Sequence, residues 1–403
     1  MRILLVGMHN SPHLHRWVRM IDDGRATILL FPVLRTEVPL PPEFKRIPLE
    51  AVTADLAPGV WIVEPADIGS VEEARLNADR DFVLCTHTFV HTDYMASPAR
   101  LLAVINAYRP DLLHSLETQL AGYLCLDTLK QLDRSRPPWI ASSWGSDLLL
   151  FHRFERHRNV LRRFCTSIDY FLPDAARDLT IARRLGYAGP TLEAMPATGG
   201  IDVDRLAAFS ETPPSARKSI IVKGYHNWAG RSLLALSALV LAREQLRGFS
   251  IGILVPGPQP ATWAARMADE LNIDIEPLPY LPHPDDAMRR MAGARAVIGI
   301  SISDGMPTMT LEAMTVGAFP IQSISSCADE WLVDGETGRL VPPDDTRAIA
   351  HAVVDVLTDD RLVDEAASRN LTAIRRRWNI ESNRERIWDI YRRVAATLTI
   401  GAV

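Results

Sequence analysis

The sequence contains few of the features that mark secreted, metal-bound or membrane-spanning proteins. Its 403 residues include only four cysteines, which lie far apart and form no CxxC pair. A disulfide scaffold or a zinc ribbon is therefore not expected, and a reducing compartment suits the chain. No run of about 18 apolar residues occurs, and the apolar start is too short for a secretory signal. We expect a cytoplasmic protein, held at most peripherally at the inner face of the membrane.

Excess positive charge is also missing. The 49 acidic residues outnumber the 44 basic ones, so the net charge is −5 and no nucleic-acid partner is expected. The motifs GxGxxG, GxxxxGK[ST] and GxSxG do not occur. Their absence disfavours dinucleotide oxidoreductases, P-loop enzymes and α/β-hydrolases.

Two series of alternating strands and helices follow one another along the chain. The first opens with an apolar strand at Arg2–Val6, a helix whose N-cap is Ser11, and a second strand at Ala26–Phe31. Such βαβ order predicts parallel sheets covered by helices. A polar, proline-bearing segment at 207–219 separates this series from the next. We therefore predict an α/β fold of two Rossmann-like, doubly wound domains facing each other across a cleft. The expected domains are 1–208, completed by a C-terminal helix at about 381–403, and 209–380.

The stretch from 296 to 323 carries the clearest chemical signal. A buried strand runs into the loop 304–307, and a helix follows from Thr308. Gly305 permits an unusual backbone angle and Pro307 suits a helix start. The free N–H groups of the first helical turn predict a phosphate or diphosphate site. Glu312 lies one turn further on, where a carboxylate can accept hydrogen bonds from two ribose hydroxyls.

Asp304 ends the strand, at a place where a carboxylate can hold sugar hydroxyls. Taken singly, Asp304 is equally explained as a helix-start residue and Glu312 as an exposed helical glutamate. Their occurrence together with the glycine, the proline and the preceding strand favours a ligand site.

These residues resemble a known family. Asp304-x7-Glu312-Ala-Met, followed by Gly317-Ala-Phe-Pro-Ile, is similar to the signature of retaining glycosyltransferases of the GT-B fold. The matching group is the family-four type, the glycosyl transferases group 1. Three further segments resemble the same family, namely WGSDL (144–148), GGIDVDRL (199–206) and DEWLVDGETGRLVPPDD (329–345).

The resemblance implies transfer of a sugar from a nucleotide diphosphate donor with retention of anomeric configuration and without a metal or resident cofactor. The second domain would bind the donor, with Glu312 on the ribose. In the family, the first glutamate of the signature contacts the donor sugar. Asp304 stands in its place, and the aspartate side chain is one methylene shorter. We therefore expect an altered sugar preference and not a loss of activity. The residues expected around the diphosphate are Gly224, Gly305, Met306, Pro307, Thr308, Met309 and Thr310.

Positive charge is needed where the diphosphate leaves. Lys223 ends a strand and Arg231 opens the following helix, although their spacing differs from that of the family's arginine and lysine. An arginine fork and a lysine point charge can nevertheless neutralise a diphosphate together.

The first domain would bind a carbohydrate or lipid-linked acceptor. The segment DLLHSLE (111–117) is similar to the family's "D-V-V-H-x-H", but its second histidine position is Leu116, so His114 is the candidate catalytic histidine. A buried, hydrogen-bonded His114 is an equally good explanation. The residues expected on the acceptor side of the cleft are His9, Asn10, His13, Trp144 and Asp147.

Residues 152–163 carry five arginines and one glutamate. They form either a solvated helix face or a surface that meets anionic lipid. The overall prediction is a hexose transferase acting in surface polysaccharide or glycoconjugate synthesis. The alternatives are a GT-B nucleotide-sugar epimerase and a non-catalytic sugar-binding subunit derived from a transferase.

Overall fold

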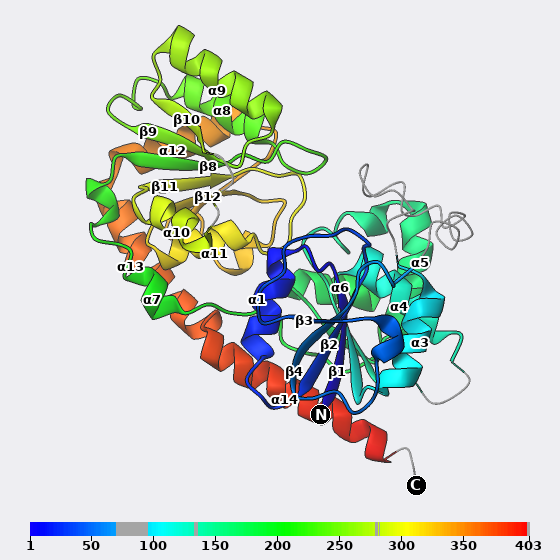
Figure 1. Ribbon diagram of the computed structural model, residues 1–403. Coiled ribbons are helices and arrows are strands. Elements are labelled where there is room, and N and C mark those ends of the chain that lie inside the picture. Colours follow the sequence, from blue (N-terminus) through cyan, green and yellow to red (C-terminus); the bar gives the residue numbers. More distant parts are fainter. Residues whose placement is uncertain (70–95, 133–135, 279–280, 282, 401–403) are drawn as a thin grey trace. The chain divides into compact units, whose positions relative to one another are not determined.

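The computed structural model describes residues 1–69, 96–132, 136–278, 281 and 283–400 (Figure 1). The chain divides into two compact units. Unit 1 comprises Met1–Gly200 and Glu381–Val403, and unit 2 comprises Ile201–Ile380. The short apolar run at 81–85, which predicts a further strand of the first domain, lies outside the described residues.

A parallel sheet lies at the centre of unit 1. Among the described residues it has seven strands in the order β3-β4-β2-β1-β5-β6-β7. In β1 (Arg2–Gly7) every residue after the first is buried, which explains its continuous apolar sequence. The register places Ile3 beside both Ile28 and Leu112. The other strands are β2 (Thr27–Pro32), β3 (Lys45–Ile47), β4 (Gly59–Val63), β5 (Leu112–Leu116), β6 (Trp139–Ser142) and β7 (Tyr170–Leu172).

Helices cover this sheet and begin where the sequence provides caps. Ser11 caps α1 (Pro12–Ile21) by accepting from the His13 N–H at 3.2 Å, and Leu14, Trp17, Val18, Met20 and Ile21 are buried. Ser97 caps α3 (Pro98–Tyr108) in the same way. The remaining helices in the described part before residue 200 are η1 (Leu49–Ala51), the π-helix η3 (Thr118–Gly122), α4 (Tyr123–Leu129), η4 (Phe151–Arg153), α5 (Glu155–Ser167) and α6 (Ala176–Arg184).

The C-terminal helix α14 (Ile380–Ile400) returns to unit 1. Trp388 and Tyr391 are buried there, and the Trp17 indole N–H donates to the Tyr391 hydroxyl at 3.2 Å. Both ends of the chain therefore contribute to the packing of this unit.

Unit 2 contains a second parallel sheet, in the order β10-β9-β8-β11-β12-β13. Ile220, Val222, Ile251, Ile253, Ile298 and Ile321 are buried in its core. Its strands are β8 (Ser219–Lys223), β9 (Ser250–Leu254), β10 (Ile275–Leu278), β11 (Ala296–Gly299), β12 (Phe319–Ser323) and β13 (Arg339–Val341). Its helices are α7 (Val203–Ala207), η5 (Pro214–Ala216), α8 (Ser232–Leu241), α9 (Pro258–Leu271), α10 (Pro284–Ala292), α11 (Thr308–Thr315), η6 (Ala328–Glu330), α12 (Thr346–Thr358) and α13 (Asp360–Arg377).

The strand order of unit 2 reverses between β8 and β11. β8 continues to β9 on one side, while β11 and β12 lie on the other. Ligands of open parallel sheets bind beyond the carboxyl ends of the strands at such a switch point. Lys223 ends β8 and Asp304 follows β11, so the fold itself places both residues at this position.

Candidate functional site

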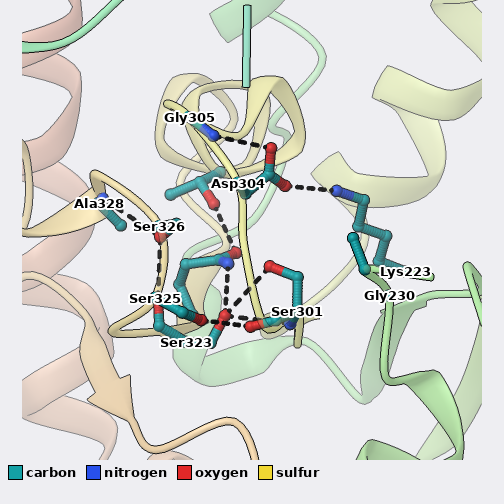
Figure 2. A network of polar contacts seen from close by, with 12 residues as sticks. Lys223, Gly230, Ser301, Asp304, Gly305, Ser323, Ser325, Ser326 and Ala328 are labelled. Carbon is teal, nitrogen blue, oxygen red and sulfur yellow. Dashed lines mark hydrogen bonds and ion pairs between the residues drawn. The ribbon is translucent and has the colours of Figure 1, made fainter. Parts of the chain in front are cut away.

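Asp304 and Lys223 form an ion pair at the switch point of unit 2. The Lys223 Nζ lies 3.1 Å from the Asp304 Oδ2, and the Asp304 Oδ1 accepts the Gly305 N–H at 3.0 Å (Figure 2). Both side chains are mostly but not fully buried, at 21% and 24% exposure. Burial opposes the charge on Lys223, but the Asp304 carboxylate, Tyr225 and Glu312 raise the pKa of Lys223 above its ordinary value. The ammonium group is therefore charged at neutral pH.

The amino end of α11 adjoins this ion pair. Pro307 is its N-cap, and the helix begins at Thr308. The Pro307 carbonyl accepts the Thr310 N–H at 2.9 Å, and the Thr310 hydroxyl donates to the Gln322 side chain at 3.0 Å. Thr310 is therefore occupied within the fold. The amides of Thr308 and Met309, which open the helix, are the better candidates for a diphosphate.

Glu312 lies on the same side of α11 as the ion pair. It is half-buried, and its charge contributes to raising the pKa of Lys223. This electrostatic effect associates the Glu312 carboxylate with the ion pair. The arrangement therefore places a lysine and two carboxylates by the start of a helix.

The loop between β8 and α8, residues 224–231, is joined to the strand that leads into Asp304. The Arg231 N–H donates to the Ile300 carbonyl at 2.9 Å, and the Ile302 N–H donates to the Ala229 carbonyl at 2.9 Å. Gly224 is required in this loop because a Cβ there would lie 2.4 Å from the Leu254 carbonyl oxygen. The two loops that carry the candidate residues therefore form one connected layer.

Arg231 is half-buried and uses one guanidinium nitrogen within its own loop. Its Nη1 donates to the carbonyls of Asn227 at 3.0 Å and Gly230 at 2.8 Å. These two hydrogen bonds fix the direction of the Arg231 guanidinium group. Tyr225 and Trp228 of the same loop are 50% and 41% exposed, which leaves two aromatic faces accessible beside the site.

A network of serines lies beneath the Asp304 loop. The Ser323 hydroxyl accepts the Ser301 N–H at 3.0 Å and the Gln322 side-chain amide at 3.2 Å, and the Ser325 hydroxyl donates to the Ser301 carbonyl (Figure 2). These bonds connect the ends of β11 and β12. The network therefore holds the backbone from which Asp304 projects.

His114 in unit 1 is buried completely. Its Nδ1 lies 2.8 Å from the Tyr391 Oη and its Nε2 lies 2.8 Å from the Ser142 Oγ. Burial lowers the pKa of His114 to about 3, so the ring is neutral and its two nitrogens serve as one donor and one acceptor. Because no part of the ring is exposed, we assign His114 a structural role instead of the catalytic one.

Three of the residues predicted for the acceptor side, His13, Trp144 and Asp147, lie together after β1 and β6. The rings of His13 and Trp144 meet edge to face at 5.6 Å, and the Trp144 N–H donates to the Asp147 Oδ2 at 2.7 Å. His9 is buried with its Nε2 donating to the Thr36 carbonyl at 2.7 Å, whereas Asn10 is exposed. Asp147 also accepts the Thr118 N–H at 2.8 Å, so its carboxylate is committed to the backbone of unit 1.

Glu117 is a buried carboxylate that the sequence does not single out. It has a positive φ of 87° and accepts the N–H groups of Gln119, Leu120 and Ala121 at 2.6, 2.7 and 3.1 Å. Burial raises the pKa of Glu117 to about 7, against the effect of those three bonds. Burial and the nearby Glu117 charge also raise the pKa of Asp147. The carboxyl groups of Glu117 and Asp147 thus fix the start of η3 by accepting its backbone N–H groups.

Within the described part of the chain, no three histidine, cysteine, aspartate or glutamate side chains gather as a metal-ligand set. In the same residues, no helix has the length and apolar character needed to cross a bilayer.

The chain is similar to known proteins in sequence and in fold. Residues 220–359 match the sequence model of the glycosyl transferases group 1. A phosphatidyl-myo-inositol mannosyltransferase of Mycolicibacterium smegmatis is 25% identical over 190 residues, which cover 45% of this chain and 47% of that protein. Its counterpart from Mycobacterium leprae is 24% identical and covers 54% and 58%. The matched region thus spans about half the length of these relatives.

Solved structures resemble nearly the whole chain. Sucrose-phosphate synthase from Thermosynechococcus elongatus superposes with a TM-score of 0.71 at 16% identity, covering 98% of this chain and 100% of that one. Anabaena HepE in complex with UDP-glucose gives a TM-score of 0.64 at 13% identity, with 99% of both chains covered.

Residues 220–359 are thus similar in sequence to the glycosyl transferases group 1, and the chain as a whole has the fold of GT-B glycosyltransferases. The predicted GT-B fold class is thereby confirmed, and the sequence model that matches residues 220–359 is that of the predicted family.

The sequence pattern does not reveal the serine network or the Asp304–Lys223 contact. A signal for the serines was present, because Ser323 ends the buried strand β12, and Ser301 and Ser325 lie shortly after the ends of β11 and β12. No comparable signal marked the ion pair, whose partners are 81 positions apart.

Proposed function

We propose that this protein is a retaining glycosyltransferase that moves a hexose-type sugar from a nucleotide diphosphate donor to an acceptor. The observation that carries the proposal is the meeting of Lys223, Asp304 and Glu312 at the amino end of α11. A positive side chain and free helical amides suit a diphosphate, and a carboxylate one turn further on suits vicinal hydroxyls.

Unit 2 supplies the donor-binding groups in this proposal. The Thr308 and Met309 amides, together with Lys223, bind the diphosphate, and Glu312 accepts hydrogen bonds from the ribose. Arg231 presents the guanidinium nitrogens that its own loop does not use. As the bond to the sugar breaks, negative charge grows on the diphosphate, and these fixed positive groups stabilise it. Gly224 and Gly305 let the backbone approach the ligand closely.

The relatives support a nucleotide-sugar donor and a lipid-linked carbohydrate acceptor. The curated relatives are named phosphatidyl-myo-inositol mannosyltransferases, and the HepE structures contain UDP-glucose or UDP. We propose that the residues beyond β1 and β6 of unit 1, including His13 and Trp144, bind the acceptor. Surface polysaccharide or glycoconjugate synthesis is the proposed setting.

An exposed basic face on α5 suits such an acceptor. Arg156, Arg162 and Arg163 are exposed on this helix, and Phe154 at its start is 48% exposed. Arginines beside an exposed aromatic side chain fit the surface of an anionic bilayer. We propose that α5 contacts the inner face of the membrane peripherally.

Product analysis with purified protein tests the proposed activity. The protein is incubated with UDP-, GDP- and ADP-linked hexoses, with and without carbohydrate and lipid-linked acceptors, and products are resolved by NMR. We expect a new glycosidic bond with the anomeric configuration of the donor, formed only when acceptor is present and also in excess EDTA. An altered sugar without acceptor would instead identify an epimerase, and nucleotide binding without turnover would identify a binding subunit.

A further inference from the structure

Asp304 already has a partner for each carboxylate oxygen before any ligand is bound. Its Oδ1 accepts the N–H of Gly305 at 3.0 Å and its Oδ2 accepts the Lys223 ammonium at 3.1 Å (Figure 2). A carboxylate has about four acceptor positions, so these two contacts use one position on each oxygen and fix the orientation of the group. The geometry of Asp304 is that of a side chain oriented by the backbone and directed at a lysine.

Lys223 is enclosed by groups that favour its charge. The Tyr225 ring lies 5.4 Å from its Nζ, and Glu312 acts on it in addition to Asp304. An ammonium group has three donor hydrogens, so a single bond to Asp304 leaves two for phosphate oxygens. Lysine is also uncommon in this chain, with only four lysines among 44 basic residues. A compact point charge on a flexible stem needs a fixed partner if its direction is to be defined.

From this arrangement we infer that Asp304 is a positioning residue, which holds Lys223 in place for the donor diphosphate, and that it is not primarily a ligand of the donor sugar. The inference rests on the proposed function and assigns the role of one residue within that site. Protein kinases use the same physical device, because a phosphate-binding lysine there must be paired with a carboxylate to be active.

The two roles predict different effects on a nucleotide that has no sugar. If Asp304 orients Lys223, then Asp304→Asn weakens the binding of a bare nucleoside diphosphate. If Asp304 binds the sugar, the same change weakens only the nucleotide-sugar. Without Lys223, the Asp304 carboxylate has lost its counter-ion and repels the diphosphate, so removing its charge should then help binding.

Isothermal titration calorimetry measures the affinity for UDP, GDP and ADP and so distinguishes the two roles. The proteins compared are wild type, Asp304→Asn, Lys223→Ala and the double variant. In the wild-type background, we expect Asp304→Asn to lower the affinity for the nucleoside diphosphate roughly ten-fold, as for loss of a charged hydrogen bond. In the Lys223→Ala background, the same substitution should leave the affinity unchanged or increase it. Asp304→Glu keeps the charge and should stay closer to wild type than Asp304→Asn does.

A second readout is the pH dependence of nucleotide binding. Asp304→Asn removes the strongest support for the charge on Lys223, while burial still opposes that charge. As pH is raised from 7 to 10, the affinity of Asp304→Asn for the nucleoside diphosphate should therefore begin to fall at a lower pH than the affinity of wild type does.

Unchanged diphosphate affinity in Asp304→Asn would overturn the inference, as would an equal loss in both backgrounds. Failure of wild type to bind UDP, GDP or ADP would instead overturn the proposed donor site itself. If Asp304→Asn does not fold, the comparison of Asp304→Glu with wild type decides. A ten-fold loss of nucleotide-sugar affinity in that variant, without any change for the bare diphosphate, contradicts the positioning role.

Discussion

His114 on β5 and Tyr391 on α14 share a 2.8 Å hydrogen bond across 277 positions of sequence. The same hydroxyl accepts the Trp17 indole N–H at 3.2 Å, and the other His114 nitrogen contacts Ser142 at 2.8 Å. The histidine therefore connects the central sheet of unit 1 to the C-terminal helix. This is the basis for assigning it a structural role.

His114→Ala should lower the free energy of unfolding by about 2–4 kcal/mol, because two buried hydroxyl groups lose their partner and a cavity forms. Urea denaturation measures the loss. UDP or GDP affinity should remain at the wild-type value at temperatures where the variant is folded. The exposed His351→Ala on α12 is the matched control and should change stability little. Wild-type stability combined with abolished transfer in His114→Ala would restore the catalytic interpretation.

Glu117 and Asp147 should make stability depend on pH. Burial raises the pKa of folded Glu117 from 4.5 to about 7, so folding favours its protonated form. The contribution is complete below about pH 4.5 and is lost as pH rises toward 7. Glu117→Gln should therefore gain stability relative to wild type as pH is raised from 5 to 8.

The measured quantity is the difference in urea midpoint between Glu117→Gln and wild type at each pH. Taking the difference cancels the titration of other groups, including His114. Glu155→Gln, at the exposed start of α5, is the control and should give a difference that does not vary with pH. A flat difference for Glu117→Gln as well would mean that Glu117 titrates normally.

Gly224 should not tolerate a side chain. A Cβ at this position would lie 2.4 Å from the Leu254 carbonyl oxygen and 2.8 Å from the Pro256 backbone, neither of which can rotate away. Gly224→Ala should therefore destabilise unit 2 by about 1–3 kcal/mol and weaken nucleotide binding, since the loop carrying Arg231 must shift. Gly257→Ala has nothing within 4 Å of the added carbon and serves as the control. Equal thermal stability and nucleotide affinity of the two variants would contradict the assigned role of this loop.

The basic face of α5 should bind anionic vesicles. We expect the triple reversal Arg156→Glu, Arg162→Glu and Arg163→Glu to abolish co-sedimentation with phosphatidylglycerol-containing vesicles, since each basic residue near such a surface contributes about 1 kcal/mol. Reversal of three exposed arginines of unit 2, at 243, 247 and 376, is the control. Vesicle binding that survives the α5 reversal, or is lost equally in the control, would remove the proposed contact.

Much of the fold could be predicted because its central strands are buried apolar runs. The apolar runs Trp139–Ser142 and Tyr170–Leu172 predict strands with the limits that β6 and β7 have, and Ser11 followed by Pro12 correctly predicts the start of α1. Two edge strands were missed. β3 (Lys45–Ile47) and β13 (Arg339–Val341) are three residues long, and each has only one buried residue. Short, exposed edge strands carry no apolar pattern, because neighbouring strands alone give them their conformation.

The site could be predicted only where its residues are close in sequence. The segment from Asp304 to Glu312 is a local motif, so its position on a strand end and a helix start followed from the residue pattern. The contact of Asp304 with Lys223 depends on β8 and β11 being adjacent in the sheet, which no local pattern reveals. The burial of His114 likewise depends on a helix that is distant in sequence.

The central claim is that Glu312 and the amino end of α11 bind a nucleoside diphosphate. Isothermal titration of UDP, GDP and ADP into wild type and Glu312→Ala tests it most directly, with Glu244→Ala, an exposed glutamate after α8, as the control. The account predicts that wild type and Glu244→Ala bind one of the three nucleotides alike, and that Glu312→Ala binds it at least roughly ten-fold more weakly. Equal affinity of Glu312→Ala and wild type would contradict it.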